Sequence, residues 1–344
     1  MLIKKVDADR FIHGVKTALA CLIGYVFTKA IDFPVDQWLI ITILVVMCSQ
    51  VNVGGMLQKS YMRLLGTLVG SMIALFTLHF FGNNEIAEAL TITLSAMLFS
   101  YIATGEKSYS EAGTLGAVTV VIILISNNAT FIFAFERVFE IILGIIIAAL
   151  VSQFVLPIHA RENLTLNQAN AIRKLRNYYQ ATLLSDSSEN VDSYQMLDED
   201  IAKLLVQQRK LAADAIREFL GEKFNLYDFK QLLYAEKEIL RAISAMQYAY
   251  KISPHVKMLC SNNTIIKGFH LSVCQVLEKV ALHIETNEVE KQSVHIPEVT
   301  ELKAYIFSLG PGEKQEDTVY LYTFLFFAEQ VVNQLNAIKK LIFH

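Results

Sequence analysis

The sequence predicts an all-α protein in two parts, a transmembrane module of six helices followed by a helical bundle that lies in water. Residues 1–160 are mainly apolar segments with few charges, whereas residues 161–344 are rich in charged and amide side chains. The first part accounts for the mean hydropathy of +0.39, which is high for a soluble protein. We therefore predict a membrane domain over 1–160 and a cytoplasmic helical domain over 161–344.

Six apolar segments make up the predicted membrane domain. A bilayer core of ~30 Å needs ~20 helical residues, and several segments are shorter, so we expect them to tilt or to be buried against neighbours. The first segment is too long for a cleaved signal peptide, and no small-residue cleavage site follows it. Trp38 opens the second segment, as suits a residue at the membrane interface. The segments are 11–31, 38–53, 61–81, 89–103, 110–126 and 131–156.

The second and third segments are joined by a predicted turn over 52–60, which contains Asn52, Gly54 and Gly55. These residue types are typical of turns. The functional alternative is that their exposed backbone lines a cavity, as in the interrupted helices of transporters.

The distribution of Lys and Arg predicts the orientation in the membrane. Six spans place both termini on one side, and the loops of that side hold most of the basic residues, so both termini are predicted to be cytoplasmic. The opposite loops hold mainly Lys29, beside Asp32, Asp36, Glu85 and Glu88. The basic residues of the predicted cytoplasmic side are Lys4, Lys5, Arg10, Lys59, Lys107, Arg161, Arg173, Lys174 and Arg176.

The second part shows the 3.6-residue period of amphipathic helices and no strand-like alternation. One segment, 318–328, is very apolar but too short to cross a membrane, and Glu329 follows it, so we interpret it as a core helix. Breaks are predicted at 185–192, near Gly221, at 253–263 and at Pro311-Gly312. The predicted helices are 161–184, 194–220, 227–252, 263–285 and 316–342.

The composition excludes several classes of function. A net charge of −3 does not suit a nucleic-acid-binding protein. The four cysteines lack metal spacing and the eight histidines are scattered, so we expect free thiols and no metal site. Nucleotide-binding and hydrolase motifs are missing from the sequence, which predicts no catalytic residues, no cofactor and no enzyme.

Two arginines lie inside apolar segments and are the first candidate site residues. Arg63, Thr67, Gly70 and Ala74 recur at helical spacing on one face of the third segment, where Gly66 and Gly70 allow another helix to approach closely. An Arg at the bilayer centre costs about 2.5–3.5 kcal/mol, so it usually faces protein or a water-filled path. Arg63 and Arg137 are therefore candidate anion contacts; the alternative is that both lie near helix ends and reach toward the interface.

Acidic residues in the last two segments are candidates for proton coupling. Glu140 lies three residues after Arg137 and four after Glu136, so all three share one helical face. A neighbouring carboxylate favours the protonated form of Glu140, whereas Arg137 opposes it. The alternative is a structural ion pair between Arg137 and Glu140. Glu111, at the start of the fifth segment, is a third candidate, and an ordinary position at a loop end is its alternative.

A degenerate internal repeat relates the two arginines. Arg63 is followed seven residues later by Gly70 and then by Ala74, and Arg137 is followed by Gly144 and then by Ala148. An apolar run precedes each Arg, over 42–52 and 119–128. If the similarity is not due to chance, each unit has three spans and the two copies are inverted in the membrane, with a transport site at their interface.

These motifs resemble a known family. Trp38 with the following apolar run, and the segment Arg63-Leu-Leu-Gly66-Thr67-Leu-Val-Gly70, resemble the membrane module of the fusaric acid resistance (FUSC) family. That module is similar to the one of the aromatic acid exporters and, more distantly, of the aluminium-activated malate transporters. Arg137, Gly144 and Pro157 resemble its end, so the resemblance covers about residues 10–157.

The resemblance implies a six-span module, a cytoplasmic helical domain and the transport of organic anions, often aromatic carboxylates, out of a bacterial cytoplasm. Many members carry two modules, and a single one implies a homodimer. The malate transporters, which have basic residues along the pore, would make Arg63 and Arg137 pore residues by analogy. We add Thr67, Gly70 and Gly144 as further substrate or pore candidates.

We therefore predict a homodimeric, multi-pass protein of the bacterial inner membrane that exports organic anions by proton entry. Its predicted partners are the lipid bilayer and a small organic anion. An uncoupled anion channel is one alternative. A membrane-anchored helical bundle that binds or regulates another protein, without transport, is the other.

Overall fold

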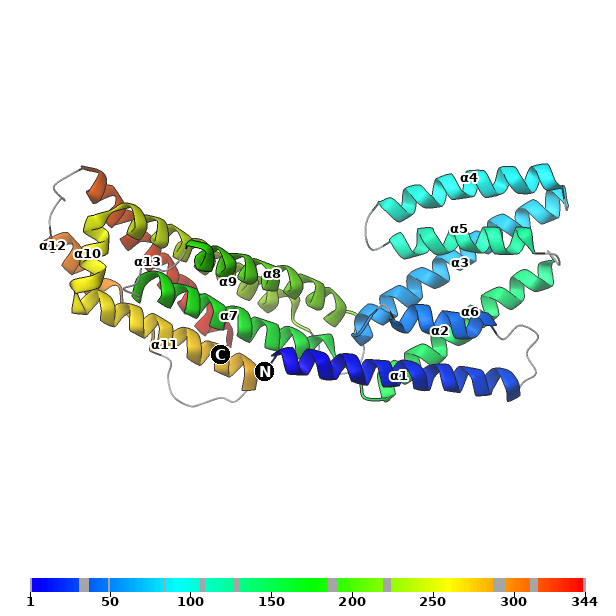
Figure 1. Cartoon of the computed structure of the whole chain (residues 1–344), viewed down its shortest axis with the longest axis horizontal. Coiled ribbons are helices and arrows are strands. Elements are labelled where there is room, and N and C mark those ends of the chain that lie inside the picture. Colours follow the sequence, from blue (N-terminus) through cyan, green and yellow to red (C-terminus); the bar gives the residue numbers. More distant parts are fainter. Residues whose placement is uncertain are drawn as a thin grey trace. The chain divides into compact units, whose positions relative to one another are not determined.

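A computed structural model covers the whole chain and describes residues 2–30, 37–48, 50–82, 84–105, 109–126, 130–184, 191–218, 224–286, 295–309 and 315–342. Within these ranges there are thirteen helices and no strand, which confirms the all-α prediction (Figure 1). Asp32, Asp36, Lys107, Gly221, Pro311-Gly312 and residues 185–190 of the predicted break at 185–192 lie outside the described residues. Residues 191–192 of that break lie in a helix.

The chain divides into two compact units. Unit 1 consists of Met1–Ala160 and Ala213–Gly221, and unit 2 of Arg161–Ala212 and Glu222–His344. The segment from 213 to 218, which the sequence pattern assigned to a bundle helix, therefore belongs to unit 1 by its contacts.

The described residues of unit 1 form six helices, besides the segment from 213 to 218. Three are long and apolar enough to cross a membrane: residues Ala8–Ala30 of α1, the whole of α3 and the whole of α4. The apolar helices α2 and α5 are shorter, at 12 and 16 residues. Large apolar side chains on the outer faces of α1, α4 and α6 are exposed, as suits contact with lipid. The bounds are α1 Leu2–Ala30, α2 Gln37–Cys48, α3 Val53–Phe81, α4 Glu85–Thr104, α5 Ser110–Ile125 and α6 Phe131–Phe154.

The helices of unit 1 pack in a regular pattern. Helix α3 lies along α5 and also contacts α6, and α5 lies between α3 and α4 (Figure 1). Helix α2 packs on α6, and α1 covers both α2 and α6. Helix α3 thus links the pair α4–α5 to the group formed by α1, α2 and α6.

The predicted turn at 52–60 is wrong, because α3 begins at Val53 and its first residues are buried. A Cβ on Gly54 would lie 1.9 Å from the Asp214 carbonyl oxygen, so only glycine allows the 213–218 segment to pack here. The Asn52 amide donates to the Asp214 carboxylate at 3.5 Å, and Glu218 Oε1 accepts the Ala160 backbone N–H at 2.6 Å. The glycines permit a close chain crossing and do not expose backbone to a cavity.

Unit 2 is a bundle whose central pair is α9 and α13. The predicted break at 253–263 is mostly a short helix, α10, which Ser253 caps by accepting the Val256 N–H at 3.3 Å. Helix α12 was also not predicted. Both have nine residues, too few to show a clear period. The bounds are α7 Ala160–Leu184, α8 Val191–Ala215, α9 Leu226–Ile252, α10 Pro254–Asn262, α11 Thr264–Thr286, α12 Thr300–Ser308 and α13 Gln315–Ile342.

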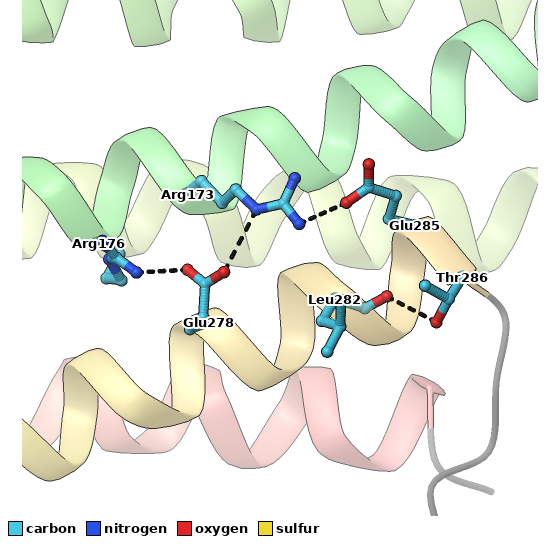
Figure 2. Close-up of polar contacts among 6 residues, drawn as sticks. All are labelled: Arg173, Arg176, Glu278, Leu282, Glu285 and Thr286. Carbon is cyan, nitrogen blue, oxygen red and sulfur yellow. Dashed lines mark hydrogen bonds and ion pairs between the residues drawn. The ribbon is translucent and has the colours of Figure 1, made fainter. Parts of the chain in front are cut away.

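Ion pairs join α7 to α11 on the partly exposed side of the bundle (Figure 2). Arg173 pairs with both Glu278 and Glu285, and Arg176 Nη1 lies 2.5 Å from Glu278 Oε2. Between the same two helices, the buried Tyr179 hydroxyl lies 2.5 Å from His270 Nδ1. These ion pairs are therefore partly exposed to water, whereas the contact between Tyr179 and His270 is buried.

Candidate functional site

One face of α3 carries the small residues that the sequence singled out, and it is buried. A Cβ on Gly66 would lie 2.4 Å from the Ala112 carbonyl oxygen, and one on Gly70 would lie 2.5 Å from that of Gly116. Both neighbours are backbone atoms of α5. The glycines therefore let the backbones of α3 and α5 approach closely, as predicted for a small-residue face.

The same face carries polar groups, of which Arg63 is the most prominent. Arg63 is 3% exposed, and its Nη2 donates to Thr42 Oγ1 on α2 at 3.3 Å. Among the described residues, Arg63 Nε and Nη1 have no hydrogen-bond partner, and neither do the buried hydroxyls of Thr67 and Ser71. About two helical turns of α3 thus present several buried hydrogen-bond donors that the described protein atoms do not satisfy.

Glu111 lies near this face but is already paired. Its carboxylate is 3.2 Å from Lys59 Nζ, one turn before Arg63. Both side chains are partly exposed, at 18% for Lys59 and 27% for Glu111. This arrangement fits the alternative in which Glu111 is an ordinary residue at the start of a helix.

Arg137 on α6 has a different environment from Arg63. Its Nη1 donates to Glu140 Oε2 at 3.1 Å, and Glu140 is fully buried. The guanidinium lies over the rings of Trp38 and Phe133, at 4.9 and 4.5 Å from the ring centroids. Glu136 is only half-buried. An ion pair and two aromatic rings therefore hold Arg137 in place.

Thr42 brings the two arginine regions together. It accepts the hydrogen bond from Arg63, and its Cβ would lie 2.8 Å from a Cβ placed on Gly144 of α6. Trp38, which stacks on Arg137, is one turn earlier on α2. Both candidate arginines thus approach the same short helix, at consecutive turns.

The interfaces α3–α5 and α6–α2 are built in the same way. Gly70 faces the Gly116 carbonyl and, at 3.1 Å, the Cβ of Thr119, three residues further along. Gly144 faces the Leu39 carbonyl, at 2.9 Å, and Thr42, also three residues further along. Gly70 thus contacts Thr119 as Gly144 contacts Thr42, and in the sequence repeat Gly70 corresponds to Gly144 and Thr119 to Thr42.

Two basic residues of α1 that the sequence pattern did not single out lie inside unit 1. Lys16 is fully buried and donates to the Ser152 carbonyl at 3.1 Å, and His13 Nε2 lies 2.7 Å from the Met47 carbonyl oxygen. The available signal was a lysine within an apolar helix, which is costly unless it has a role. Within the described residues, no group of three or more His, Cys, Asp or Glu side chains is arranged to hold a metal ion.

Comparison with known proteins identifies the family. The model of the fusaric acid resistance protein family matches residues 10–218, more than half of the chain. The chain belongs to the fusaric acid resistance protein family. The match extends beyond residue 157 to residue 218 and so includes Asp214, which packs on Gly54.

Two bacterial proteins illustrate the relationship within the family. Inner membrane protein YeeA of Escherichia coli (strain K12) is 26% identical over 212 residues, which are 61% of this chain and 58% of YeeA. Multidrug resistance protein MdtO of Shigella flexneri is 30% identical over 176 residues, which are 49% of this chain and 26% of MdtO. The chain thus covers less than two thirds of either relative.

Proposed function

We propose that this protein exports organic anions, with aromatic carboxylates as the first candidates, across a bacterial inner membrane and that proton entry drives the export. The observation that carries the proposal is Arg63, a buried cation with two nitrogen positions that no described residue satisfies. A carboxylate accepts strong hydrogen bonds from a guanidinium, so it has the charge and the acceptor oxygens to bind there. Thr67 and Ser71 supply further donors on the same face.

The relatives support the direction and the location of this proposal. YeeA is named as an inner membrane protein, and MdtO as a multidrug resistance protein, which suits efflux. We propose that unit 1 spans the membrane six times, with both termini in the cytoplasm as the basic residues predict, and that two chains form a homodimer.

The proposed binding site lies at the interface of an inverted repeat formed by α1–α3 and α4–α6. The matching contacts of Gly70 and Gly144 support this repeat. The short helices α2 and α5 occupy corresponding positions in the two halves. A pair of short apolar segments at corresponding positions is typical of transporters whose site lies at the repeat interface.

Arg137 and Glu140 have separate roles in the proposal. Arg137 contributes positive charge beside Trp38 and Phe133, whose rings suit an aromatic carboxylate. Glu140 is the fully buried carboxylate of this region and is the group that takes up the proton. Glu136 and Glu111 remain weaker candidates, because Glu136 is half-buried and Glu111 pairs with Lys59.

Reconstituted vesicles test the proposal with phthalate and succinate as probes. Both are dicarboxylates that are mainly ionised near pH 7 and cross lipid slowly. An acidic lumen should drive their accumulation, and Glu140→Gln should abolish the dependence on the proton gradient while exchange of labelled for unlabelled probe continues. Full gradient-driven accumulation by Glu140→Gln would refute the coupling role of Glu140.

Arg137→Gln and the wild-type protein complete the test. The variant should transport poorly at low probe concentration, and wild-type transport by this variant would refute an anion contact at Arg137. Wild-type flux without any response to the proton gradient would favour the uncoupled channel. Absence of flux for every carboxylate, with folded protein, would favour the anchored bundle.

A further inference from the structure

Lys16 is a buried basic residue that the proposed function does not use. It is the ninth residue of the apolar segment Ala8–Ala30, and none of its surface is exposed. Among the described residues, its ammonium makes one hydrogen bond, to the Ser152 carbonyl, and no carboxylate lies within ion-pair distance. A lysine this deep in an apolar helix, without a counter-ion among the described residues, is a candidate functional group.

The ends of two helices lie beside Lys16 and His13. Ser152 lies in the last turn of α6, and Met47, which accepts from His13 one turn before Lys16, lies in the last turn of α2. Helices α2 and α6 run in the same direction, because Trp38 meets Arg137 and Thr42 meets Gly144. Their carboxyl ends therefore meet α1 together.

The carboxyl end of a helix carries partial negative charge and favours a cation. In transporters with broken helices, such ends coordinate the coupling Na⁺ or H⁺. His13 and Lys16 lie at the carboxyl ends of α2 and α6, where a cation is favoured. Both side chains can gain or lose a proton. We propose that Lys16 is a second proton-exchange site, at the cytoplasmic end of the module, and this inference rests on the proposed proton-coupled transport.

Among the described residues, few ionisable groups of α1, α2 and α6 lie near these helix ends. His13 lies on the same helix, α2 contributes the exposed Cys48, and the acid of α6 nearest in sequence to Ser152 is Glu140. Glu140 and Ser152 are twelve residues apart, about 18 Å of helix. In the proposed orientation, Glu140 faces the incoming proton and Lys16 the cytoplasm. The ammonium releases one proton to cytoplasmic water, becomes a neutral amine, and is protonated again by the next proton that arrives.

Lys16→Arg separates this role from a structural one, because arginine keeps the charge and the hydrogen bond but does not release its proton. The full-length variant in vesicles should retain phthalate exchange at equal pH. The accumulation that an acidic lumen drives should fall at least tenfold in this variant. The linked proton flux, which a trapped pH dye reports, should fall with it. Lys16→Met, which is neutral in every state, should give the same pattern.

Two results would overturn the inference alone while the wild-type protein remains coupled. One is gradient-driven accumulation by Lys16→Arg at the wild-type level. The other is that Lys16→Met fails to fold and to exchange phthalate, while Lys16→Arg remains coupled. That result would make Lys16 a structural residue. A wild-type protein without gradient-driven accumulation would instead remove the coupled function on which the inference rests.

Discussion

Units 1 and 2 are both helical, but they bury different kinds of residue at their helix contacts. In unit 1, α3 meets α5 through Gly66 and Gly70, whose backbones nearly touch the neighbouring carbonyls. In unit 2, large side chains such as Tyr179 and Phe324 are fully buried. Lipid is as apolar as a protein core, so helices in a membrane associate by close backbone approach, whereas helices in water associate by burying apolar area.

One buried ionisable group of unit 1, Arg63, differs from two buried ionisable groups of unit 2 in that it cannot become neutral. Burial raises the pKa of Glu236 on α9 to about 8 and lowers the pKa of His270 on α11 to about 3, so both are neutral near pH 7. Arg63 in unit 1 has no such option, because a guanidinium does not lose its proton in proteins. A buried arginine therefore indicates a functional contact more strongly than a buried acid or histidine does.

The largest expected effect comes from a glycine at the close contact. Gly70→Leu should prevent folding of unit 1, because its side chain would displace the backbone of α5 at Gly116, at a cost of about 5 kcal/mol or more. Gly268→Leu in α11 is the matched control, since a Cβ there meets nothing within 4 Å. Size-exclusion chromatography and thermal unfolding in detergent measure both. Equal thermal stability of the two variants would contradict the claim that the contact between α3 and α5 requires glycine.

The second effect concerns Glu236. Below its ordinary pKa of 4.5, both the folded and the unfolded state hold its proton; between pH 4.5 and about 8, only the folded state does. The free energy of unfolding should therefore fall as the pH rises through this range, by on the order of 5 kcal/mol. Glu236→Gln should lack this fall and be the more stable protein at pH 8. Hydrogen exchange of α9 amides at pH 5 and pH 8 measures the stability of both proteins. The same change in stability between these pH values in the wild type and in Glu236→Gln would contradict the prediction.

The third effect concerns Arg63. Arg63→Gln should lower transport of phthalate by about 10- to 100-fold, because a hydrogen bond to a charged group contributes about 1.5–3 kcal/mol. Arg173→Gln is the control in the bundle, where Arg173 pairs with Glu278 and Glu285 near the surface. This substitution should leave transport unchanged. Transport that falls equally in both variants would indicate a general loss of stability and not an anion contact.

Local patterns in the sequence were enough to predict the helical class and the buried face from Arg63 to Ala74, because a helical period depends only on neighbouring residues. Contacts between distant segments were not predictable in this way. Gly54 and Gly55 resembled a turn, but they lie in a helix because Asp214, far along the chain, packs on them.

The same limit applies to the site. Lys16 became visible as buried only when α2 and α6 placed their carboxyl ends around it. Thr42 likewise gained its role from the position of Arg63 on another helix. The sequence indicates which residues are unusual for their surroundings, and the packing decides which of them meet.

The smallest effect distinguishes an anion-binding hydroxyl from one that is merely buried. If Ser71 donates to the anion, Ser71→Ala should weaken phthalate transport by about 2- to 5-fold, the contribution of one neutral hydrogen bond. If the hydroxyl is only buried, its removal should instead stabilise the protein and leave transport unchanged, because an unsatisfied polar group is costly. Ser272→Ala in the bundle is the control, since that hydroxyl donates to the Gly268 carbonyl at 2.9 Å. Transport and thermal unfolding of both variants therefore decide whether the donors of α3 act as a group or Arg63 acts alone.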